Sequence, residues 1–345
     1  MSQSLWQKLA DSPPFLIAEV GQNHDGSLGQ AHAFIDAIAA TGAHAVKFQT
    51  HIAAEESCPD EPFRVNFSYE DATRFDYWRR MEFNQDQWQE LERHANERDL
   101  VFLSSPFSLA AVELLDSIGV PAWKVASGEV GSRRMIERMA ATGKPLIVST
   151  GMSGYDEIDD AVLPLRQKSA AFVLMQCTSA YPSPLASTGL NVLDEFRKRY
   201  ECPVGLSDHS GSTLPAVAAA LHGAQVIEVH VTLGKQMFGP DVAASLDIAE
   251  LRRLAEDLEG VAEILSHTVD KDWTASNAAE MRRLFGKSAV AVRALDEGAI
   301  VTEDDVTFLK PSWGIAEKDF DPLMGKRLKR PVPQGKRFEV EDFQE

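Results

Sequence analysis

Two histidines, His209 and His230, are the residues of this sequence whose placement most directly suggests chemistry. They lie in a stretch that reads VGLSDHS, then an amphipathic run at 213–222, then QVIEVHVT, a pattern typical of strand, helix and strand. Such a crossover makes the two strands parallel, so both end at the same edge of a sheet and bring the imidazoles together. Converging imidazoles suggest a divalent metal site, although each histidine could instead cap a loop or pack in a core.

Two lysines lie inside segments that otherwise have the apolar character of strands: Lys47 in AVKFQ and Lys124 in AWKVA. Lysine is rarely buried without a partner, so each ammonium group needs an anion, and Glu19 or Glu129 could supply it. Serines at the ends of several neighbouring strands add hydroxyl groups around the same opening. Two ammonium groups with several hydroxyls favour a pocket for a phosphate and a carboxylate over purely internal ion pairs.

A metal site beside an anion pocket predicts Lewis-acid polarisation of a carbonyl group next to a phosphorylated substrate. With two histidine ligands, the remaining coordination positions would be taken by oxygen atoms of water or substrate. That donor set favours a labile octahedral ion such as Mn2+ over a closed zinc site, with Mg2+ and Co2+ as alternatives.

The elements that must position these residues are short apolar runs alternating with helical patterns. We expect eight strands, at 15–20, 43–49, 100–104, 122–126, 145–149, 171–176, 203–206 and 225–231. We expect eight main helices, at 29–41, 85–98, 109–118, 133–141, 155–167, 191–200, 213–222 and 249–267. Eight repeats predict an α/β fold of the (β/α)8 (TIM) barrel type. A doubly wound sheet is disfavoured because EVGQNHDG, after the first strand, lacks the glycine spacing of a dinucleotide-binding turn.

Two further regions depart from this alternation. The connection at 51–84 is long and rich in aromatic residues and arginine, so it is either a lid over the site or a surface excursion. From residue 286 the repeats give way to short β-like pieces with glycine and proline turns. The predicted domains are therefore a barrel at 1–280 and a small β-rich domain at 286–345, too small to be stable without support.

Bulk composition limits the classes of partner. The net charge is −18, which argues against a nucleic acid or a membrane surface as partner, because both are anionic. The three cysteines are an odd number without a framework spacing, and the N-terminus lacks the features of a signal peptide. We therefore expect a cytoplasmic protein that acts on small molecules.

Eight ordered sequence blocks resemble the signatures of the N-acetylneuraminate (sialic acid) synthase family. They read IAEVGQNHDG, VKFQT, FLSSPF, KVASGEV, VSTGM, QCTSAYPSP, GLSDHS and EVHVT followed by FGPD. The resemblance covers essentially the whole chain, since the tail is similar to that family's C-terminal antifreeze-like (SAF, β-clip) domain. It implies condensation of phosphoenolpyruvate with the open-chain aldehyde of an N-acyl amino sugar of the N-acetylmannosamine type, giving a nonulosonic acid and phosphate.

The resemblance also implies roles for individual residues. His209 and His230 match the metal ligands, and Glu19, Lys124 and Glu129 the catalytic residues, with Glu129 the base that activates water. Phosphoenolpyruvate contacts match Lys47, Ser105, Lys124, Ser127, Ser149, Ser179 and Ser207. Sugar contacts match Glu19, Gln49, Glu129, Tyr181, Asp241 and Lys310. A homodimer is implied as well, in which the small domain of one subunit covers the barrel mouth of its partner.

Three positions depart from the family pattern. Lys310 stands where a sugar-binding arginine is expected, Ser105 replaces a threonine, and Ser179 stands where some members have asparagine. Lysine lacks the planar two-pronged donor geometry of arginine, so the identity of the sugar is open. A legionaminic or pseudaminic acid synthase, or a related phosphoenolpyruvate-dependent sugar-acid synthase, is an alternative.

Two other classes of protein are alternatives as well. A class II aldolase would need a third protein ligand to its metal, and the sequence offers no third histidine in the pattern. A non-enzymatic alternative is a carbohydrate-binding module on an inactive barrel. The retention of charged residues at the ends of the predicted strands argues against that alternative.

Overall fold

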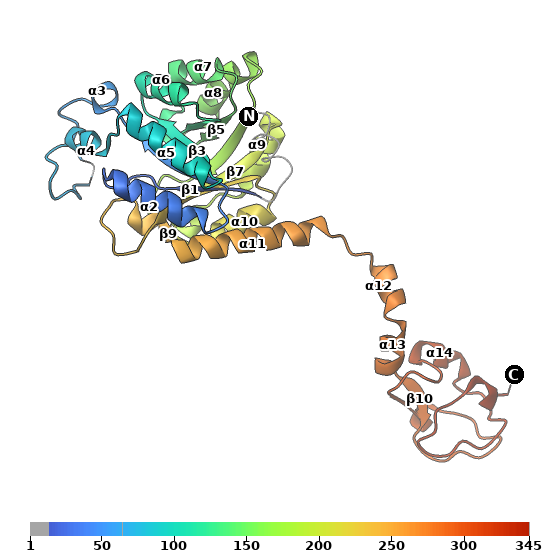
Figure 1. The fold of residues 1–345 in the computed structure, drawn as a ribbon. Coiled ribbons are helices and arrows are strands. Elements are labelled where there is room, and N and C mark those ends of the chain that lie inside the picture. The colour runs from blue at the N-terminus through green and yellow to red at the C-terminus, as the bar shows by residue number, and fades with distance from the viewer. Residues whose placement is uncertain (1–13, 64, 345) are drawn as a thin grey trace. The chain divides into compact units, whose positions relative to one another are not determined.

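The computed structural model describes residues 14–63 and 65–344, which form two compact units (Figure 1). The first unit ends at Ser266 and the second begins at His267, whereas the sequence placed the end of the barrel domain at 280. The expectation that the N-terminus carries no signal peptide concerns residues 1–13, outside the described residues. Each unit is considered by itself below.

The first unit is built on eight parallel strands. Their bounds are β1 (Phe15–Glu19), β2 (Ala45–Thr50), β3 (Val101–Pro106), β4 (Trp123–Val125), β5 (Leu146–Ser149), β6 (Phe172–Cys177), β7 (Val204–Asp208) and β8 (Val226–Thr232). They pair in the order β3-β2-β1-β8-β7-β6-β5-β4, and β3 and β4 lie against each other and nearly close the ring. A short strand, β9 (Ser245–Asp247), pairs with β8. The predicted (β/α)8 barrel is confirmed.

The helices that follow the strands surround this barrel (Figure 1). They are α2 (Leu28–Ala39), α5 (Gln85–Glu97), α6 (Leu109–Ile118), α7 (Arg133–Ala140), α8 (Tyr155–Gln167), α9 (Asn191–Tyr200), α10 (Leu214–Leu221) and α11 (Ile248–Ser266). Capping side chains mark several starts: Ser27, Asn84 and Ser108 each accept a hydrogen bond from a backbone N–H in the first turn. Each of the eight helices lies within two residues of its expected bounds.

Alternation along the strands separates two layers of core. Side chains such as Phe102 and Trp123 point outward and pack under the helices, whereas Phe15, Ile17 and Val226 point into the barrel interior. Because the side-chain period of a strand is two, the inward positions continue to Glu19 on β1 and Glu228 on β8. The interior therefore changes from apolar to charged toward the carboxyl ends of the strands.

The connection between β2 and α5 contains two helices that the sequence did not predict, α3 (Ala53–Glu56) and α4 (Arg74–Met81). Thr73 caps α4 through a reciprocal pair of hydrogen bonds with Asp76. Arg80 ties the connection to the barrel, because its guanidinium donates to Asp71 within the connection and to Asp25 in the loop after β1. Whether the connection moves as a lid stays a prediction.

The second unit begins with two short helices, α12 (Lys271–Asn277) and α13 (Ala279–Phe285). Strands β10 (Ser288–Ala291) and β11 (Val306–Leu309) follow as an antiparallel pair, with isolated bridges elsewhere and a short helix α14 (Glu317–Phe320). A small core forms where Phe320, Phe338 and Phe343 contact one another.

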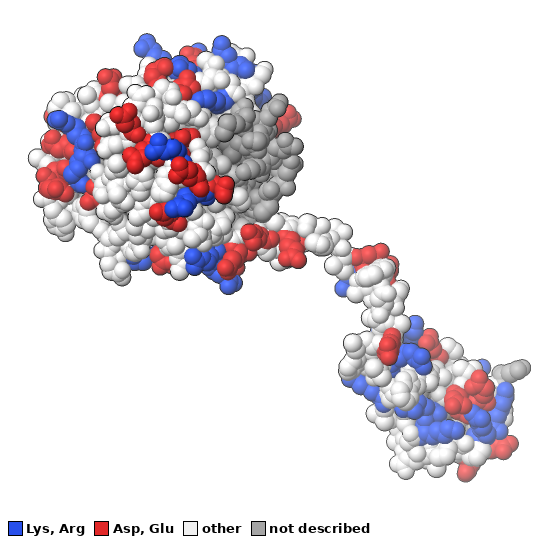
Figure 2. Space-filling model, in the orientation of Figure 1, with Lys and Arg blue, Asp and Glu red and all other residues white. Residues whose placement is uncertain are grey.

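The surface drawn in Figure 2 carries acidic and basic side chains intermixed on the barrel unit. Several of them pair across helices, such as Arg138 of α7, which donates to Glu113 and Asp116 of α6. None of the helices within residues 14–63 and 65–344 combines the length and apolar composition that crossing a membrane requires.

Candidate active site

Four buried charged side chains form a network at the carboxyl ends of the barrel strands. Lys47 Nζ lies 2.8 Å from Glu19 Oε1. Glu228 Oε1 lies between the two lysines, 3.5 Å from Lys47 Nζ and 3.3 Å from Lys124 Nζ. None of the four side chains is more than 3 % exposed. The strand register explains part of this grouping, since Glu19 lies opposite Lys47 on one side and opposite His230 on the other.

The network shows which carboxylates pair with the two lysines. Glu19 is the partner of Lys47, as one of the two sequence alternatives held. The other alternative, Glu129, is paired with neither lysine; the carboxylate shared by Lys47 and Lys124 is Glu228, which the sequence analysis missed. The signal was present, because Glu228 is a charged residue in the apolar run VIEVHV and precedes His230 by two positions, hence on the same face.

The charges in the network alter one another's proton affinity. Burial alone would raise the pKa of Glu19, but the charges of Lys47, His230 and Lys124 hold it well below its usual range. Burial would lower the pKa of Lys47, yet Glu19 and Glu228 outweigh burial and raise it. For Lys124, burial and the neighbouring Lys47 charge outweigh Glu228 and lower the pKa. An anion bound beside Lys124 would therefore stabilise the charged form of this lysine and raise its pKa again.

Serine hydroxyls surround the two ammonium groups. Lys124 Nζ donates to Ser149 Oγ at 2.7 Å, and Lys47 Nζ donates to Ser105 Oγ at 3.3 Å. Ser207 donates to Glu228. These groups open into a cavity of about 770 Å³, whose lining includes the predicted residues Glu19, Lys47, Gln49, Lys124, Ser127, Glu129, Ser149, Ser179, Tyr181, Ser207, His209, His230 and Asp241. Ser105 is buried and contacts Lys47, but it is not among the described residues that line the cavity.

The two histidines lie side by side with ring centroids 5.2 Å apart. His209 Nδ1 lies 2.9 Å from the carbonyl oxygen of Thr178, so Nδ1 carries the proton and the lone pair is on Nε2, which accepts from the Tyr181 hydroxyl. His230 Nε2 lies 3.3 Å from Glu19 Oε2. Its buried Nδ1 has no hydrogen-bond partner among the described residues and lies 3.6 Å from Asp241 Oδ2.

This donor set fits a divalent cation with open coordination positions. The His209 Nε2 atom beside the Tyr181 hydroxyl, the partnerless Nδ1 of His230 and the adjacent carboxylate oxygens are the kinds of group that such an ion binds. Within the described part of the chain, no three His, Cys, Asp or Glu side chains are grouped so that they could hold a metal ion. Water and substrate would have to complete the coordination.

A chain of hydrogen bonds runs from Glu19 outward along the cavity wall. Because the Glu19 carboxylate can only accept, the Gln49 amide donates to it at 2.7 Å and accepts from the Gln22 amide at 2.6 Å. The same Gln22 nitrogen lies 2.9 Å from His51 Nε2, and His51 Nδ1 lies 2.7 Å from Glu56 Oε1. Of these five residues, only Glu19 and Gln49 were predicted from the sequence to have roles in the site.

Glu129 lies in the 3-10 turn η1 (Ser127–Glu129) that follows β4. Its carboxylate accepts a hydrogen bond from Ser132 Oγ at 2.6 Å. Burial raises the pKa of Glu129, and the nearby Glu56 charge raises it further, against the lowering effect of the Ser132 hydrogen bond. A half-buried carboxyl group with a raised pKa has the properties of a general base or acid.

The outer wall of the cavity is aromatic and comes mainly from the β2–α5 connection. Phe63, Phe67, Tyr77 and Trp78 line it, together with Phe107 after β3. The aromatic content of this connection is evident in the sequence, but none of these residues was predicted to belong to the site.

Lys310 is the one predicted site residue in the second unit. It follows β11, and its ammonium group lies 5.3 Å from the ring centroid of Phe285. Its contact with a sugar stays a prediction.

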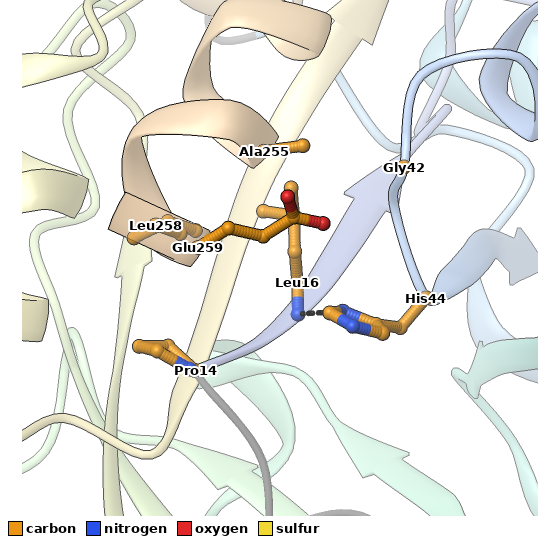
Figure 3. Close-up of a pocket in the computed structure, with 7 residues that line it drawn as sticks. All are labelled: Pro14, Leu16, Gly42, His44, Ala255, Leu258 and Glu259. Carbon is orange, nitrogen blue, oxygen red and sulfur yellow. Dashed lines mark hydrogen bonds between the residues drawn. The ribbon is translucent and has the colours of Figure 1, made fainter. Parts of the chain in front are cut away.

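A second hollow lies at the opposite end of β1 from Glu19 (Figure 3). Pro14, Leu16, His44 and Glu259 are among its lining residues, and the Leu16 backbone N–H donates to His44 Nδ1. It is far smaller than the main cavity and lies at the amino ends of the strands, where barrels of this type carry stabilising rather than catalytic residues.

A barrel with paired lysines, serine hydroxyls and two histidines at its mouth defines an enzyme, and comparison with known proteins identifies its class as an acid synthase. Residues 34–270 match the model of the NeuB family, and residues 286–336 match that of the SAF domain. The chain therefore belongs to the NeuB family, and the predicted family resemblance and antifreeze-like domain are confirmed.

Individual relatives carry names of related synthases. The chain is 33% identical over 321 residues to N-acetylneuraminate-9-phosphate synthase of Homo sapiens, covering 92% of this chain and 89% of the relative. It is 31% identical over 318 residues to N,N'-diacetyllegionaminic acid synthase of Campylobacter jejuni, covering 90% of this chain and 94% of the relative. The crystal structure of N-acetylneuraminic acid (sialic acid) synthetase from Leptospira borgpetersenii superposes with a TM-score of 0.70 at 28% identity, covering 79% of this chain and 92% of that one.

The role of Glu228 can be tested by Glu228→Gln, which keeps the shape of the side chain and removes its charge. Two buried ammonium groups would then share one carboxylate, so we expect the free energy of unfolding to fall by about 3 kcal/mol. Urea unfolding followed by circular dichroism measures this change. The matched control, Glu97→Gln, removes an exposed carboxylate and should change stability by less than about 0.5 kcal/mol. An unchanged unfolding midpoint in Glu228→Gln would show that the lysines do not depend on this carboxylate.

Proposed function

We propose that this protein condenses phosphoenolpyruvate with the open-chain aldehyde of an N-acyl amino sugar of the N-acetylmannosamine type, giving a nonulosonic acid and free phosphate. The observation that carries the proposal is the position of Lys47 and Lys124, buried at the strand ends beside the two histidines in one cavity. Membership in the NeuB family and the names of the relatives support the same reaction. A legionaminic or pseudaminic acid synthase, which would use a different sugar, is the alternative.

The inner part of the cavity suits phosphoenolpyruvate. Its phosphate and carboxylate need cations and hydroxyl donors, which Lys47, Lys124, Ser149 and Ser207 provide around Glu228. Ser127 adds a hydroxyl beside the Gly151 backbone N–H, which donates to it. The cations are already held by buried partners, so little reorganisation is needed when the anion enters.

The histidine pair suits the aldehyde end of the sugar. His209 and His230 would hold a divalent cation, which we propose to be Mn2+ with Mg2+ and Co2+ as alternatives. When bound, such a cation acts as a Lewis acid on a carbonyl oxygen. Tyr181, which donates to His209 and lines the cavity, and Asp241, which accepts from the Gln22 backbone N–H, would orient the sugar.

Bond formation joins C3 of phosphoenolpyruvate to the aldehyde carbon, and water adds at C2 before phosphate leaves. Glu129 is the proposed base, because its carboxylate borders the cavity and its raised pKa favours accepting a proton from water. Ser132 holds that carboxylate in place. Lys124 would stabilise the negative charge that develops on the phosphate as it leaves.

Phosphate release from phosphoenolpyruvate tests the reaction. The purified protein with Mn2+ and N-acetylmannosamine should release phosphate, and His209→Ala should lower kcat by at least about 100-fold because one metal ligand is lost. His222→Ala is the matched control, since His222 is an exposed histidine that pairs with Asp194 on the surface. Full activity in His209→Ala would contradict the metal assignment.

The pH dependence of kcat tests Glu129. A base acts in its deprotonated form, so kcat should rise with pH through the raised pKa of this carboxyl group. Ser132→Ala removes the hydrogen bond that lowers the pKa, so the rising limb should move to higher pH. Glu129→Gln should lower kcat by about 100-fold or more. Ser117→Ala is the control. If the rising limb of the pH profile of kcat does not move in Ser132→Ala, the base is another group.

We also infer that the protein forms a homodimer. The second unit exposes large apolar side chains, among them Phe285, Trp313 and Val340, each at least 60% exposed, and the helices α12 and α13 bury no residue. A second copy of the chain would cover such a surface. Sedimentation equilibrium should give the mass of a dimer, and Trp313→Ala with Phe285→Ala should weaken it. A monomer that retains activity would contradict the inference.

A further inference from the structure

The outer half of the cavity contains buried polar atoms that have no hydrogen-bond partner within residues 14–63 and 65–344. They are the Tyr77 hydroxyl, Gln22 Oε1 and Glu56 Oε2. All three side chains line the cavity, on the wall that leads from Glu19 toward the β2–α5 connection. Buried polar groups are costly when unpaired, so a ligand that reached these atoms would gain hydrogen bonds there. Two of the three atoms are acceptors and need donors, such as the O–H and N–H groups of a sugar.

The charge of this half is negative. Glu56, Glu61 and Glu129 line it, and Arg74 is the one cationic side chain among the lining residues supplied by the connection. Arg74 is already engaged, because its Nε lies 3.4 Å from Glu61 and its guanidinium lies 4.9 Å from the ring centroid of Trp78.

His51 is the hydrogen-bond partner of Glu56 on this wall. The Gln22 amide nitrogen is a donor only, so His51 Nε2 accepts from it, and the ring proton is on Nδ1, which donates to Glu56. The Glu56 carboxylate thus has one oxygen bound to His51 and a second, Oε2, without a hydrogen-bond partner among the described residues.

The remaining surface of the wall is flat and apolar. The His51 ring stacks between Trp78 and Phe107, with centroid distances of 4.1 Å and 4.5 Å. Tyr77 packs against Phe67 at 5.0 Å and against Trp78 at 5.2 Å. Such faces bind C–H groups and methyl groups, which on a sugar are provided by N-acyl and deoxy positions.

We propose that the outer half of the cavity is the subsite for the non-reacting end of the sugar, and that it accepts an uncharged N-acylated or deoxy sugar and excludes a sugar phosphate. The proposal rests on the proposed function, which places phosphoenolpyruvate at the two lysines and the aldehyde at the histidines. The rest of the sugar must then lie against the wall of Tyr77, Trp78 and Glu56. A second phosphate there would meet the carboxylates of Glu56 and Glu129, and like charges at a desolvated contact are strongly unfavourable.

The test measures the rate of phosphoenolpyruvate consumption by the full-length protein with N-acetylmannosamine, its 6-phosphate, and a 6-deoxy diacetamido hexose. We expect kcat/KM for the 6-phosphate to be at least about 100-fold below that for the better uncharged sugar. Glu56→Gln should reduce the ratio of kcat/KM for the uncharged sugar to kcat/KM for the 6-phosphate about tenfold, because one repelling charge is removed. Glu55→Gln is the matched control, as Glu55 is the exposed neighbour on α3 and does not line the cavity. An equal or higher kcat/KM for the 6-phosphate would overturn the proposal.

The apolar wall is tested by Trp78→Ala, which should raise KM for the uncharged sugar about tenfold and leave KM for phosphoenolpyruvate unchanged. Tyr69→Ala is the control, because Tyr69 is a fully exposed aromatic residue of the same connection outside the cavity lining. A rise in both KM values, or in neither, would contradict a subsite for the sugar alone.

Calorimetric titration with each sugar separates this proposal from the proposed reaction. Tighter binding of the uncharged sugar than of its 6-phosphate, lost in Trp78→Ala, supports the subsite even in a protein that consumes no phosphoenolpyruvate. Equal or tighter binding of the 6-phosphate overturns the subsite whether or not turnover occurs.

Discussion

The structure of the site depends on two ammonium groups held inside a barrel by two carboxylates. A lysine buried alone would lose its proton or unfold the strand that carries it, so the pairing of Lys47 with Glu19 and the shared position of Glu228 are what allow charge at this depth. The network also leaves Lys124 without a carboxylate of its own, because Glu228 is shared with Lys47. It is therefore stable as it stands and still receptive to an anion.

The alternation of side chains along each strand places the charged groups in one layer of the barrel interior. Inward positions alternate along each strand, and the apolar layer of Phe15, Ile17 and Val226 fills the lower barrel before the polar layer begins. The apolar layer excludes water from below, which strengthens the electrostatic interactions above it. Catalytic groups at the mouth thus rely on packing that contains no catalytic residue.

Much of this arrangement could be predicted from the sequence, because strands and their polar ends follow from local pattern. Lys47 and Lys124 were recognisable as charged residues in apolar runs, and the parallel strands forced His209 and His230 together. Glu228 carried the same signal but was not recognised. The same short run contains His230, which was interpreted as a metal ligand, and Glu228 was given no role.

The wall of the cavity was beyond prediction for a physical reason. Gln22, His51 and Glu56 become a hydrogen-bonded series only because Glu19 fixes the direction of the Gln49 amide, and no periodicity encodes such long-range orientation. The two helices of the β2–α5 connection are only four and eight residues long, too short for a hydrophobic pattern to define. Their positions depend on tertiary contacts such as the Arg80 pair with Asp25.

The β2–α5 connection is one continuous segment between a strand and a helix. The lysine network, in contrast, is built from four strands, β1, β2, β4 and β8. Under the proposals made above, recognition of the non-reacting end of the sugar rests mainly on this connection, and bond formation rests on the strand ends. Replacement of this single excursion by that of a relative would exchange one recognition surface for another on an unaltered reaction centre. A family built in this way can diversify its products by remodelling one loop-sized module at a time.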